Sequence, residues 1–152
     1  MSEPSIQERL YPDLMCFGCG QANLKGLRLR SYPADGYVSA EFTPWPEHDN
    51  GGGFLNGGII ATVLDCHSGA AVFHEVERRG LPRTPEVPLP YVTAGLDVRY
   101  LRPTPLHQTL QLRGSIESAD DEQVTVAVEL LWDGKARASA TARWLRWRPR
   151  PR

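Results

Sequence analysis

The sequence predicts an α+β protein in which one antiparallel sheet wraps around a single long helix. One helical pattern covers residues 58 to about 77, and two short strand patterns precede it. Four longer strand patterns follow it, and their apolar and polar residues alternate as in half-buried strands. The last strand has a row of alanines on one face, at positions 136, 138, 140 and 142. Such small side chains indicate that the helix packs close against the sheet there.

The segments before the helix are short and irregular. Residues 1–15 are expected to form a loose N-terminal arm, and the segments 26–32 and 37–42 read as two strands joined by the turn sequence "PADG". The next stretch, "TPWPEHDNGGGFLNGG", holds too much proline and glycine for regular structure.

The helix and the later strands have clear limits. The first two helical turns are apolar on most sides, and the last turn is charged, so we expect burial at the N-terminal end and exposure at the C-terminal end. The sequence "GLPRTPEVPLP" ends the helix. Four strands are then expected at 91–101, 109–117, 123–132 and 135–147, and "DG" at 133–134 marks a hairpin between the last two.

Size and composition favour a single globular domain over residues 1–152, with a basic tail at 147–152. The net charge of −1 argues against nucleic acid or an anionic membrane as a partner. The longest apolar run is too short to span a membrane, and the N-terminus has no apolar signal segment. Three cysteines, an odd number, fit a reduced cytoplasmic setting.

The start of the helix is a candidate chemical site. A helix N-terminus offers unpaired N–H groups and a partial positive charge, and Gly57 and Gly58 would let a ligand approach those donors closely. Such a place suits a carbonyl oxygen that becomes negative during a reaction. Asn56 stands where an N-cap stands, so a purely structural role, with Asn56 as the cap and the glycines as a turn, is equally open.

Asp65 is the second candidate. A carboxylate in the apolar part of a helix costs several kcal/mol unless it is paired or near water. One interpretation is a structural salt bridge to an arginine such as Arg99. The other is a carboxylate that lines a cleft and acts as a general base or nucleophile.

Distance along the helix separates the two candidates. Gly57 and Asp65 are eight residues apart, or about 12 Å at a rise of about 1.5 Å per residue. No substrate atom can contact both within one chain. If they act together, they come from two chains related by a symmetric interface, with antiparallel helices and two equivalent sites.

These residues resemble the hotdog-fold acyl-CoA thioesterases, in the branch that includes the phenylacetate-pathway and human mitochondrial thioesterase-superfamily enzymes. The family pattern is roughly N-x-x-G-x-x-H-G-G followed by an acidic residue, and this sequence matches it at five positions: Asn50, Gly53, Gly57, Gly58 and Asp65. The segments "VTAGLDVRYLRPTP" and "CFGCGQANLKGLRLR" are also similar to segments of the family.

The resemblance implies hydrolysis of an acyl-CoA thioester, with coenzyme A as part of the substrate and no separate cofactor. Asp65 would attack the thioester or activate water, the Gly57 N–H of the partner chain would polarise the carbonyl, and Asn50 would position carbonyl or water. It also implies a homodimer with a continuous sheet, or a tetramer of two such dimers. A hotdog dehydratase or hydratase is disfavoured, because no histidine lies at a matching position.

Asn56 departs from the family, which usually has histidine at this position. Asparagine keeps a hydrogen-bond donor of similar reach but cannot be protonated. If the donor alone matters, the chain is active; if the charge matters, it is slow, uses another substrate or only binds a ligand. A non-catalytic protein that binds acyl-CoA or a related ligand is therefore the alternative.

Further residues are candidates for substrate binding. Ser68 lies one turn from Asp65 and could hydrogen-bond it, or it could be a small residue at a helix contact. His48 is a candidate for the pocket rim. The alternation places Thr93 and Arg99 on one strand face, although which face meets a ligand cannot be read from the pattern. Arg102 is a candidate for the phosphates of coenzyme A.

The cysteines do not predict a metal site. Cys16 and Cys19 form one C-x-x-C pair, which is half of a zinc site. Cys66 and His67 would complete it only if the tertiary structure happened to bring them there. We therefore expect two ordinary thiols and no metal. His67 follows Asp65 by two residues, about 200° around a helix, and should face away from it.

Overall fold

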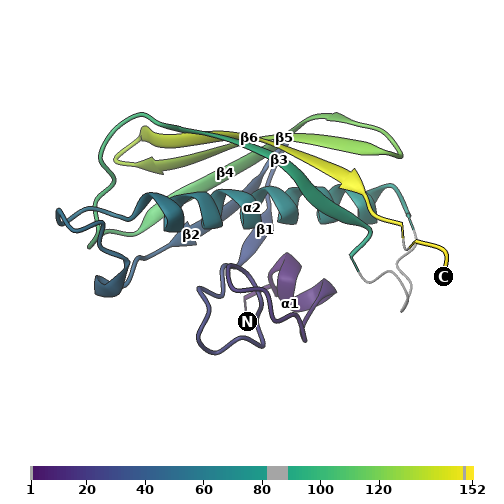
Figure 1. Ribbon diagram of the computed structural model, residues 1–152, viewed down its shortest axis with the longest axis horizontal. Coiled ribbons are helices and arrows are strands. Elements are labelled where there is room, and N and C mark those ends of the chain that lie inside the picture. Colours follow the sequence, from purple (N-terminus) through teal and green to yellow (C-terminus); the bar gives the residue numbers. More distant parts are fainter. Residues whose placement is uncertain (1, 82–88, 149) are drawn as a thin grey trace.

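The computed structural model describes residues 2–81, 89–148 and 150–152. It confirms the predicted fold class: a six-stranded antiparallel sheet, in the order β1-β2-β4-β5-β6-β3, curves over the long helix α2 (Figure 1). The strands are β1 (Ser31–Pro33), β2 (Val38–Phe42), β3 (Tyr91–Tyr100), β4 (Leu110–Ala119), β5 (Gln123–Trp132) and β6 (Lys135–Arg146). The helices are α1 (Ile6–Leu10), the 3-10 turn η1 (Pro46–His48) and α2 (Gly57–Arg78).

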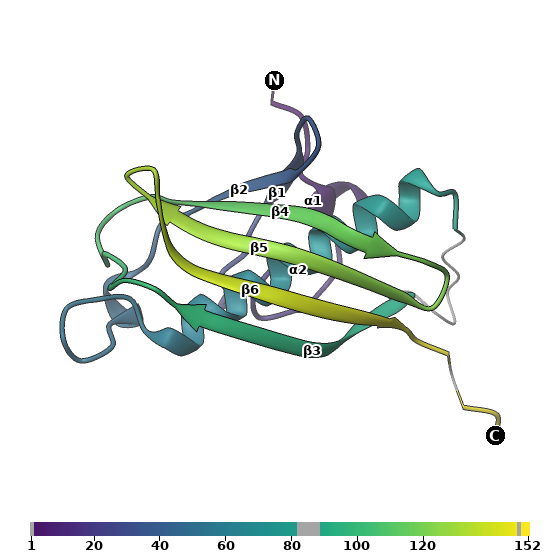
Figure 2. The same cartoon turned by 90° about the horizontal axis from the view of Figure 1, so that it is seen from above.

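The core lies between the sheet and α2, which crosses behind the strands diagonally (Figure 2). The alanine row of β6 faces the helix as expected: Ala138, Ala140 and Ala142 are all buried. On β4, a Cβ placed on Gly114 would lie only 3.3 Å from the ring of His67. Small residues on the sheet therefore set how closely α2 can approach it.

The N-terminal segment is packed, contrary to the expected loose arm. Ser5 and Glu8 form a reciprocal capping box that starts α1, and Ile6 is buried in the core. The segment covers the side of α2 that faces away from the sheet (Figure 1). A helix of five residues is too short to leave a periodic signal, so the sequence pattern does not predict it.

Only the end of the strand expected at 26–32 joins the sheet. Arg28 has a positive φ of 54°, which interrupts the extended chain. The N–H groups of Leu27 and Leu29 donate to the carbonyl oxygens of Phe17 and Gly18, at 2.8 and 3.0 Å. This segment therefore holds the N-terminal loop in place instead of pairing with β2.

The burial of α2 also differs from the expectation. Its first turn is half-exposed, and burial is continuous only in the middle, over residues 67–72. Near the C-terminal end, Glu75 is buried and pairs with Arg78 and Arg79 at 2.8 and 2.9 Å. Most of the segment that was predicted to end the helix, residues 82–88, lies outside the described residues. No described helix is long and apolar enough to cross a membrane.

The basic tail is anchored at its first residues. The N–H of Trp147 donates to the carbonyl oxygen of Pro90 at 2.9 Å. Arg148 forms two hydrogen bonds with the carboxylate of Glu122, at 2.6 and 2.8 Å. This pair is exposed at the surface, so it contributes little to stability.

Candidate active site

The glycine-rich loop before α2 is held by Asn50. Its Oδ1 accepts hydrogen bonds from the N–H groups of Gly52 and Phe54, at 2.7 and 3.3 Å. Gly51 and Gly53 have φ values of 93° and 85°, which residues with a Cβ rarely adopt. The loop conformation therefore requires these glycines, and Asn50 fixes the loop beside the helix start.

Asn56 is the N-cap of α2. Its Oδ1 accepts from the N–H groups of Gly58 and Ile59, at 2.8 and 3.2 Å. The capping role is thus confirmed and uses only the side-chain oxygen; Asn56 is not among the residues that line either pocket described below. The cap also leaves the Gly57 N–H unpaired within the helix, because Gly57 belongs to the first turn. Capping and ligand binding are therefore compatible at this helix end.

The helix start borders a hollow, which we call the helix-start pocket. Tyr100, at the end of β3, donates from its hydroxyl to the Gly57 carbonyl at 2.8 Å. Arg102 donates to the carbonyl oxygen of Ala136 at 2.8 Å and lies at the surface beside the pocket. The pocket is lined by Asn50, Phe54, Leu55, Gly57, Ile60, Tyr100, Leu101, Arg102, Pro103 and Thr104. Three residues predicted for one site, Asn50, Gly57 and Arg102, are therefore brought together here.

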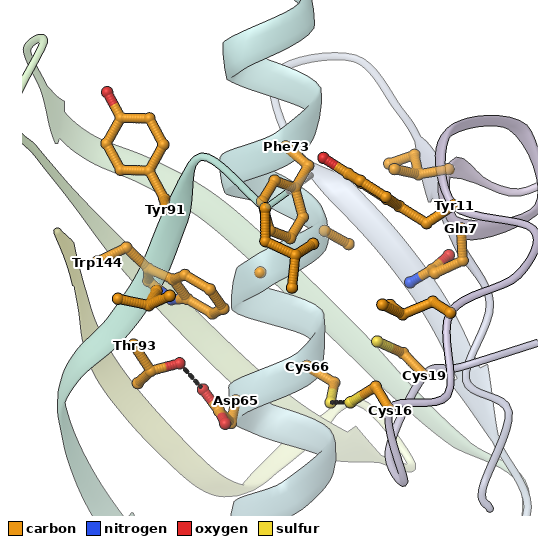
Figure 3. Close-up of a pocket in the computed structure, with 16 residues that line it drawn as sticks. Gln7, Tyr11, Cys16, Cys19, Asp65, Cys66, Phe73, Tyr91, Thr93 and Trp144 are labelled. Carbon is orange, nitrogen blue, oxygen red and sulfur yellow. Dashed lines mark hydrogen bonds between the residues drawn. The ribbon is translucent and has the colours of Figure 1, made fainter. Parts of the chain in front are cut away.

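Asp65 lies in a different hollow of about 250 Å³, the Asp65 pocket (Figure 3). Burial raises the pKa of Asp65, while a hydrogen bond from the Thr93 hydroxyl to Oδ1, at 2.8 Å, opposes that shift. The other residues that line it are mainly apolar, aromatic or cysteine: Ile6, Gln7, Tyr11, Leu14, Cys16, Cys19, Cys66, Gly69, Ala70, Phe73, Leu89, Tyr91, Val92 and Trp144. The carboxylate thus lies on a mainly apolar wall beside three cysteine sulfur atoms, and the charge of the Cys16 sulfur also raises its pKa.

A β-bulge brings Thr93 to Asp65. The pairing of β3 with β6 shifts by one residue between Thr93 and Gly95, so the side-chain alternation changes faces there. The expectation that Thr93 and Arg99 share a face is therefore wrong. Arg99 lies on the outer face and is 3.8 Å from Asp97, so it forms no salt bridge with Asp65. Among the residues that the structure describes, Asp65 has no ion-pair partner.

Ser68 acts on the pocket through Trp144. Its hydroxyl donates to the backbone carbonyl of Asp65 at 2.6 Å, and not to the carboxylate. The same hydroxyl accepts from the indole N–H of Trp144 at 2.9 Å. A Cβ on Gly69 would lie 2.8 Å from the Trp144 indole, so glycine at this position is needed for the indole to pack against α2. Trp144 was not among the residues predicted from the sequence, although its place on the alanine face of the last strand is a signal that could have indicated it.

His48 lies at the rim of neither pocket. It is 6% exposed, its Nδ1 accepts from the Trp45 N–H at 2.9 Å, and the two rings stack at 4.7 Å. It therefore stabilises the loop under Trp45 instead of facing solvent, because its ring caps the turn that begins η1. His67 faces away from Asp65, as expected, and is fully buried between Ser31 and the carbonyl of Val38.

The third cysteine joins the C-x-x-C pair. Cys66 Sγ lies 3.7 Å from Cys16 Sγ, and the sulfur atoms of Cys16, Cys19 and Cys66 all lie within 4.8 Å of one another. Hydrogen bonds from the Cys19 and Cys66 thiols hold the pKa of Cys16 far below its usual range. The same contacts with the Cys16 sulfur raise the pKa values of Cys19 and Cys66. The sequence alone could not show this, because Cys66 is 47 residues after Cys19.

The two pockets share no lining residue within one chain. One holds the Gly57 backbone donor and Arg102, and the other holds Asp65. Their separation along α2 remains about 12 Å, because the helix is continuous from Gly57 to Arg78. A single chain therefore presents two separate pockets, one with backbone N–H donors and one with a carboxylate.

Comparison with known proteins identifies the family. A sequence profile of the thioesterase superfamily matches residues 52–138, more than half of the chain, including α2 and most of the later strands. The chain belongs to the thioesterase superfamily. No curated protein matches it.

Solved structures agree with this assignment. A thioesterase superfamily protein from Shewanella loihica is 30% identical, with a TM-score of 0.65, over 84% of this chain and 98% of that one. A phenylacetic acid degradation-related protein described as a thioesterase, from Ralstonia eutropha, is 21% identical with a TM-score of 0.69, over 93% and 98% of the two chains. A Bacillus halodurans protein solved with CoA is 23% identical with a TM-score of 0.66, over 82% and 77%. The last two show the shared fold.

Proposed function

We propose that this protein hydrolyses an acyl-CoA thioester to a free acid and coenzyme A, with Asp65 as the nucleophile or general base. The observation that carries the proposal is the carboxylate of Asp65 in an aromatic pocket, without a described ion-pair partner and held by Thr93. Burial, and to a smaller extent the charge of the nearby Cys16 sulfur, raise the pKa of Asp65, which makes its ionised form a stronger base. A carboxylate in a purely structural role would be expected to have a cation beside it.

The carbonyl of the substrate would be polarised by the Gly57 N–H of the partner chain. β3 is an edge strand of the sheet (Figure 2), and its side chains Val92 and Tyr100 are 38% and 56% exposed. Pairing of two β3 edges would make one continuous sheet and set two α2 helices antiparallel on the same side of it. The helix-start pocket of one chain would then face the Asp65 pocket of the other, and a homodimer or tetramer would contain complete sites.

The proposed reaction needs one carboxylate and one oxyanion donor. Asp65 either removes a proton from water, which attacks the carbonyl carbon, or attacks that carbon directly to form an anhydride that water then opens. In both routes the carbonyl oxygen becomes negative, and the partner's Gly57 N–H stabilises it. The carbon–sulfur bond breaks, and the coenzyme A thiolate leaves and takes up a proton.

The pocket walls indicate a compact acyl group. The cavity of about 250 Å³ is bounded by the rings of Tyr11, Phe73 and Trp144 (Figure 3). Edge-to-face contact between Phe73 and Trp144, with centroids 5.8 Å apart, fixes their orientation. A short or aromatic acyl chain matches this shape better than a long flexible one. Arg102, at the other pocket, would meet the phosphates of coenzyme A.

A second candidate function is non-catalytic binding of acyl-CoA or a related ligand. The observation that favours it is Asn56, which has no charge to offer at the position where the resembling family has histidine. In that case, acyl-CoA would raise the thermal stability of the protein without release of a thiol.

The test measures thiol release from short, long and aromatic acyl-CoAs by the native chain, Asp65→Asn and Asn56→His. We expect turnover by the native chain and a loss of about 10²–10⁴-fold in Asp65→Asn. Asp97→Asn is the matched control, since Asp97 lies on the outer face of β3, and it should retain activity. Retained turnover in Asp65→Asn would refute the assigned role. Stabilisation by acyl-CoA without turnover would favour the second candidate.

A further inference from the structure

The most distinctive feature outside the proposed reaction is the group of three cysteines beside the Asp65 pocket. Cys16 and Cys19 come from the N-terminal loop, and Cys66 comes from α2, on the side that faces that loop (Figure 3). None of the three is in a disulfide, and each is half-buried. The proposed hydrolysis uses none of these sulfur atoms.

The spacing of the sulfur atoms suits a metal ion better than a covalent bond. A tetrahedral zinc ion with Zn–S bonds of about 2.3 Å places its sulfur ligands about 3.7–3.8 Å apart. Cys16 Sγ and Cys66 Sγ are 3.7 Å apart, and Cys19 Sγ lies within 4.8 Å of both. A disulfide would need about 2.05 Å between two of them and would leave the third unused.

The loop that carries Cys16 and Cys19 is built to present both sulfur atoms. The Gly20 N–H donates to the Cys16 carbonyl at 2.8 Å, which closes a tight turn. A Cβ on Gly20 would lie 2.4 Å from the Cys16 nitrogen, and a Cβ on Gly18 would lie 2.3 Å from Cys66 Sγ. Both glycines are therefore required for the approach of the loop to its own backbone and to α2.

We propose that Cys16, Cys19 and Cys66 bind one zinc ion as three thiolates and so fasten the N-terminal loop to α2. Thiolates are soft ligands that select zinc over magnesium or calcium. Each thiol that binds releases its proton, so three protons leave when all three start protonated. Among the described residues, no fourth histidine, cysteine or carboxylate lies within reach, so water from the Asp65 pocket completes the tetrahedron.

This site is structural and distinct from the proposed hydrolysis. The N-terminal loop supplies Leu14, Cys16 and Cys19 to one wall of the Asp65 pocket. A metal that bridges this loop to α2 fixes that wall beside the helix that carries Asp65. Removal of the metal should loosen the N-terminal segment and leave the sheet intact.

The test uses the full chain, purified with a phosphine reductant so that the thiols stay reduced. We expect one zinc per chain by elemental analysis, or one taken up in competition with a chromophoric chelator. Cobalt(II) should give intense thiolate charge-transfer bands and the visible absorption of a tetrahedral site. Cys16→Ser, Cys19→Ser and Cys66→Ser should each weaken metal binding by more than about 100-fold, since loss of a ligand costs at least as much as loss of a supporting contact. Asp97→Asn, an exposed change on the outer face of β3, is the control and should bind zinc like the native chain.

Three results would overturn the proposal. One is reduced native protein that neither retains nor takes up zinc while all three thiols react with a thiol reagent. Another is zinc binding that persists in the folded Cys66→Ser variant. The third is protein without bound metal that loses two thiols on exposure to air. Two of the three cysteines would then form a disulfide and act as a redox pair. The first result needs no variant, so misfolding of a cysteine variant does not weaken the test. None of the three bears on thiol release from acyl-CoA.

Discussion

The two ends of the candidate site differ in what their chemistry requires of the chain. At the helix start, the chemistry depends on backbone geometry. Asn56 caps two backbone N–H groups and leaves the Gly57 N–H uncapped, and Asn50 holds the glycine loop. At Asp65, side-chain packing is what counts: burial raises the pKa of the carboxylate, and Thr93 hydrogen-bonds it. The first region presents backbone N–H donors and the second presents a carboxylate. The hydrolysis that we propose would use both, and one α2 helix keeps them about 12 Å apart.

The largest loss of activity is expected when the backbone donor at the helix start is removed without deforming the helix. Gly57→Pro removes the N–H at the first helical position, where proline fits. The preceding Asn56 has φ −60° and ψ 135°, a conformation that a residue before proline favours. We expect activity to fall about 10²–10³-fold, as for loss of an oxyanion donor. Gly57→Ala keeps the N–H and should lose far less, so equal losses in thiol-release assays would contradict this role.

Mixing the two inactive chains tests whether the site spans two copies. Co-expressed Asp65→Asn and Gly57→Pro would form hybrid dimers in which one of the two sites has an intact Asp65 and an intact Gly57. Random pairing in a symmetric dimer predicts recovery of about a quarter of native activity. Each variant alone should stay inactive. No recovery, with hybrids verified by differential tags, would place the complete site within one chain.

The hydrogen bond from Thr93 to Asp65 can be removed while the carboxylate is kept. Thr93→Val deletes the hydroxyl that lowers the pKa of Asp65, so that pKa should rise further and the acidic limb of the pH–rate profile should move to higher pH. One hydrogen bond to a charged group, about 1.5 kcal/mol, corresponds to about tenfold in rate. Thr141→Ala, an exposed threonine on β6, is the control. A profile in Thr93→Val that shifts to lower pH would contradict the assignment.

The aromatic wall should affect stability more than rate. Ser68→Ala leaves the buried indole N–H of Trp144 without its acceptor, which should lower the free energy of unfolding by about 1–3 kcal/mol. Turnover should change only a few-fold, because Ser68 does not contact the carboxylate. Urea denaturation monitored by tryptophan fluorescence measures the first quantity. A loss of stability below the error of that measurement would show that the indole finds another partner.

The opposite face of α2 gives the smallest expected effect on activity. Burial lowers the pKa of His67 to about 4, so the folded protein binds fewer protons than the unfolded one between about pH 6.5 and 4. The free energy of unfolding should therefore fall as the pH falls through that window. His67→Gln keeps a donor for Val38 and an acceptor for Ser31, and should flatten the dependence without changing turnover at neutral pH. An unchanged slope would show that another group titrates there.

Most of the fold and the positions of the candidate residues followed from the sequence. The alternation of the late strands, the alanine row of β6 and the helical pattern after Gly57 predicted a sheet around one helix, because these patterns arise from local geometry. The spacing of Gly57 and Asp65 also predicted their separation, because a continuous helix has a fixed rise per residue.

The tertiary structure decided which side chains meet. The β-bulge after Thr93 changes the face of β3 and brings that hydroxyl to Asp65, and a single extra residue leaves no signal in an alternating pattern. Cys66 reaches Cys16 and Cys19 only because the N-terminal segment folds back over α2. Sequence alone therefore determined the elements and the distances along them. Packing between distant segments, which no local pattern encodes, determined the partners of Asp65 and of the cysteines.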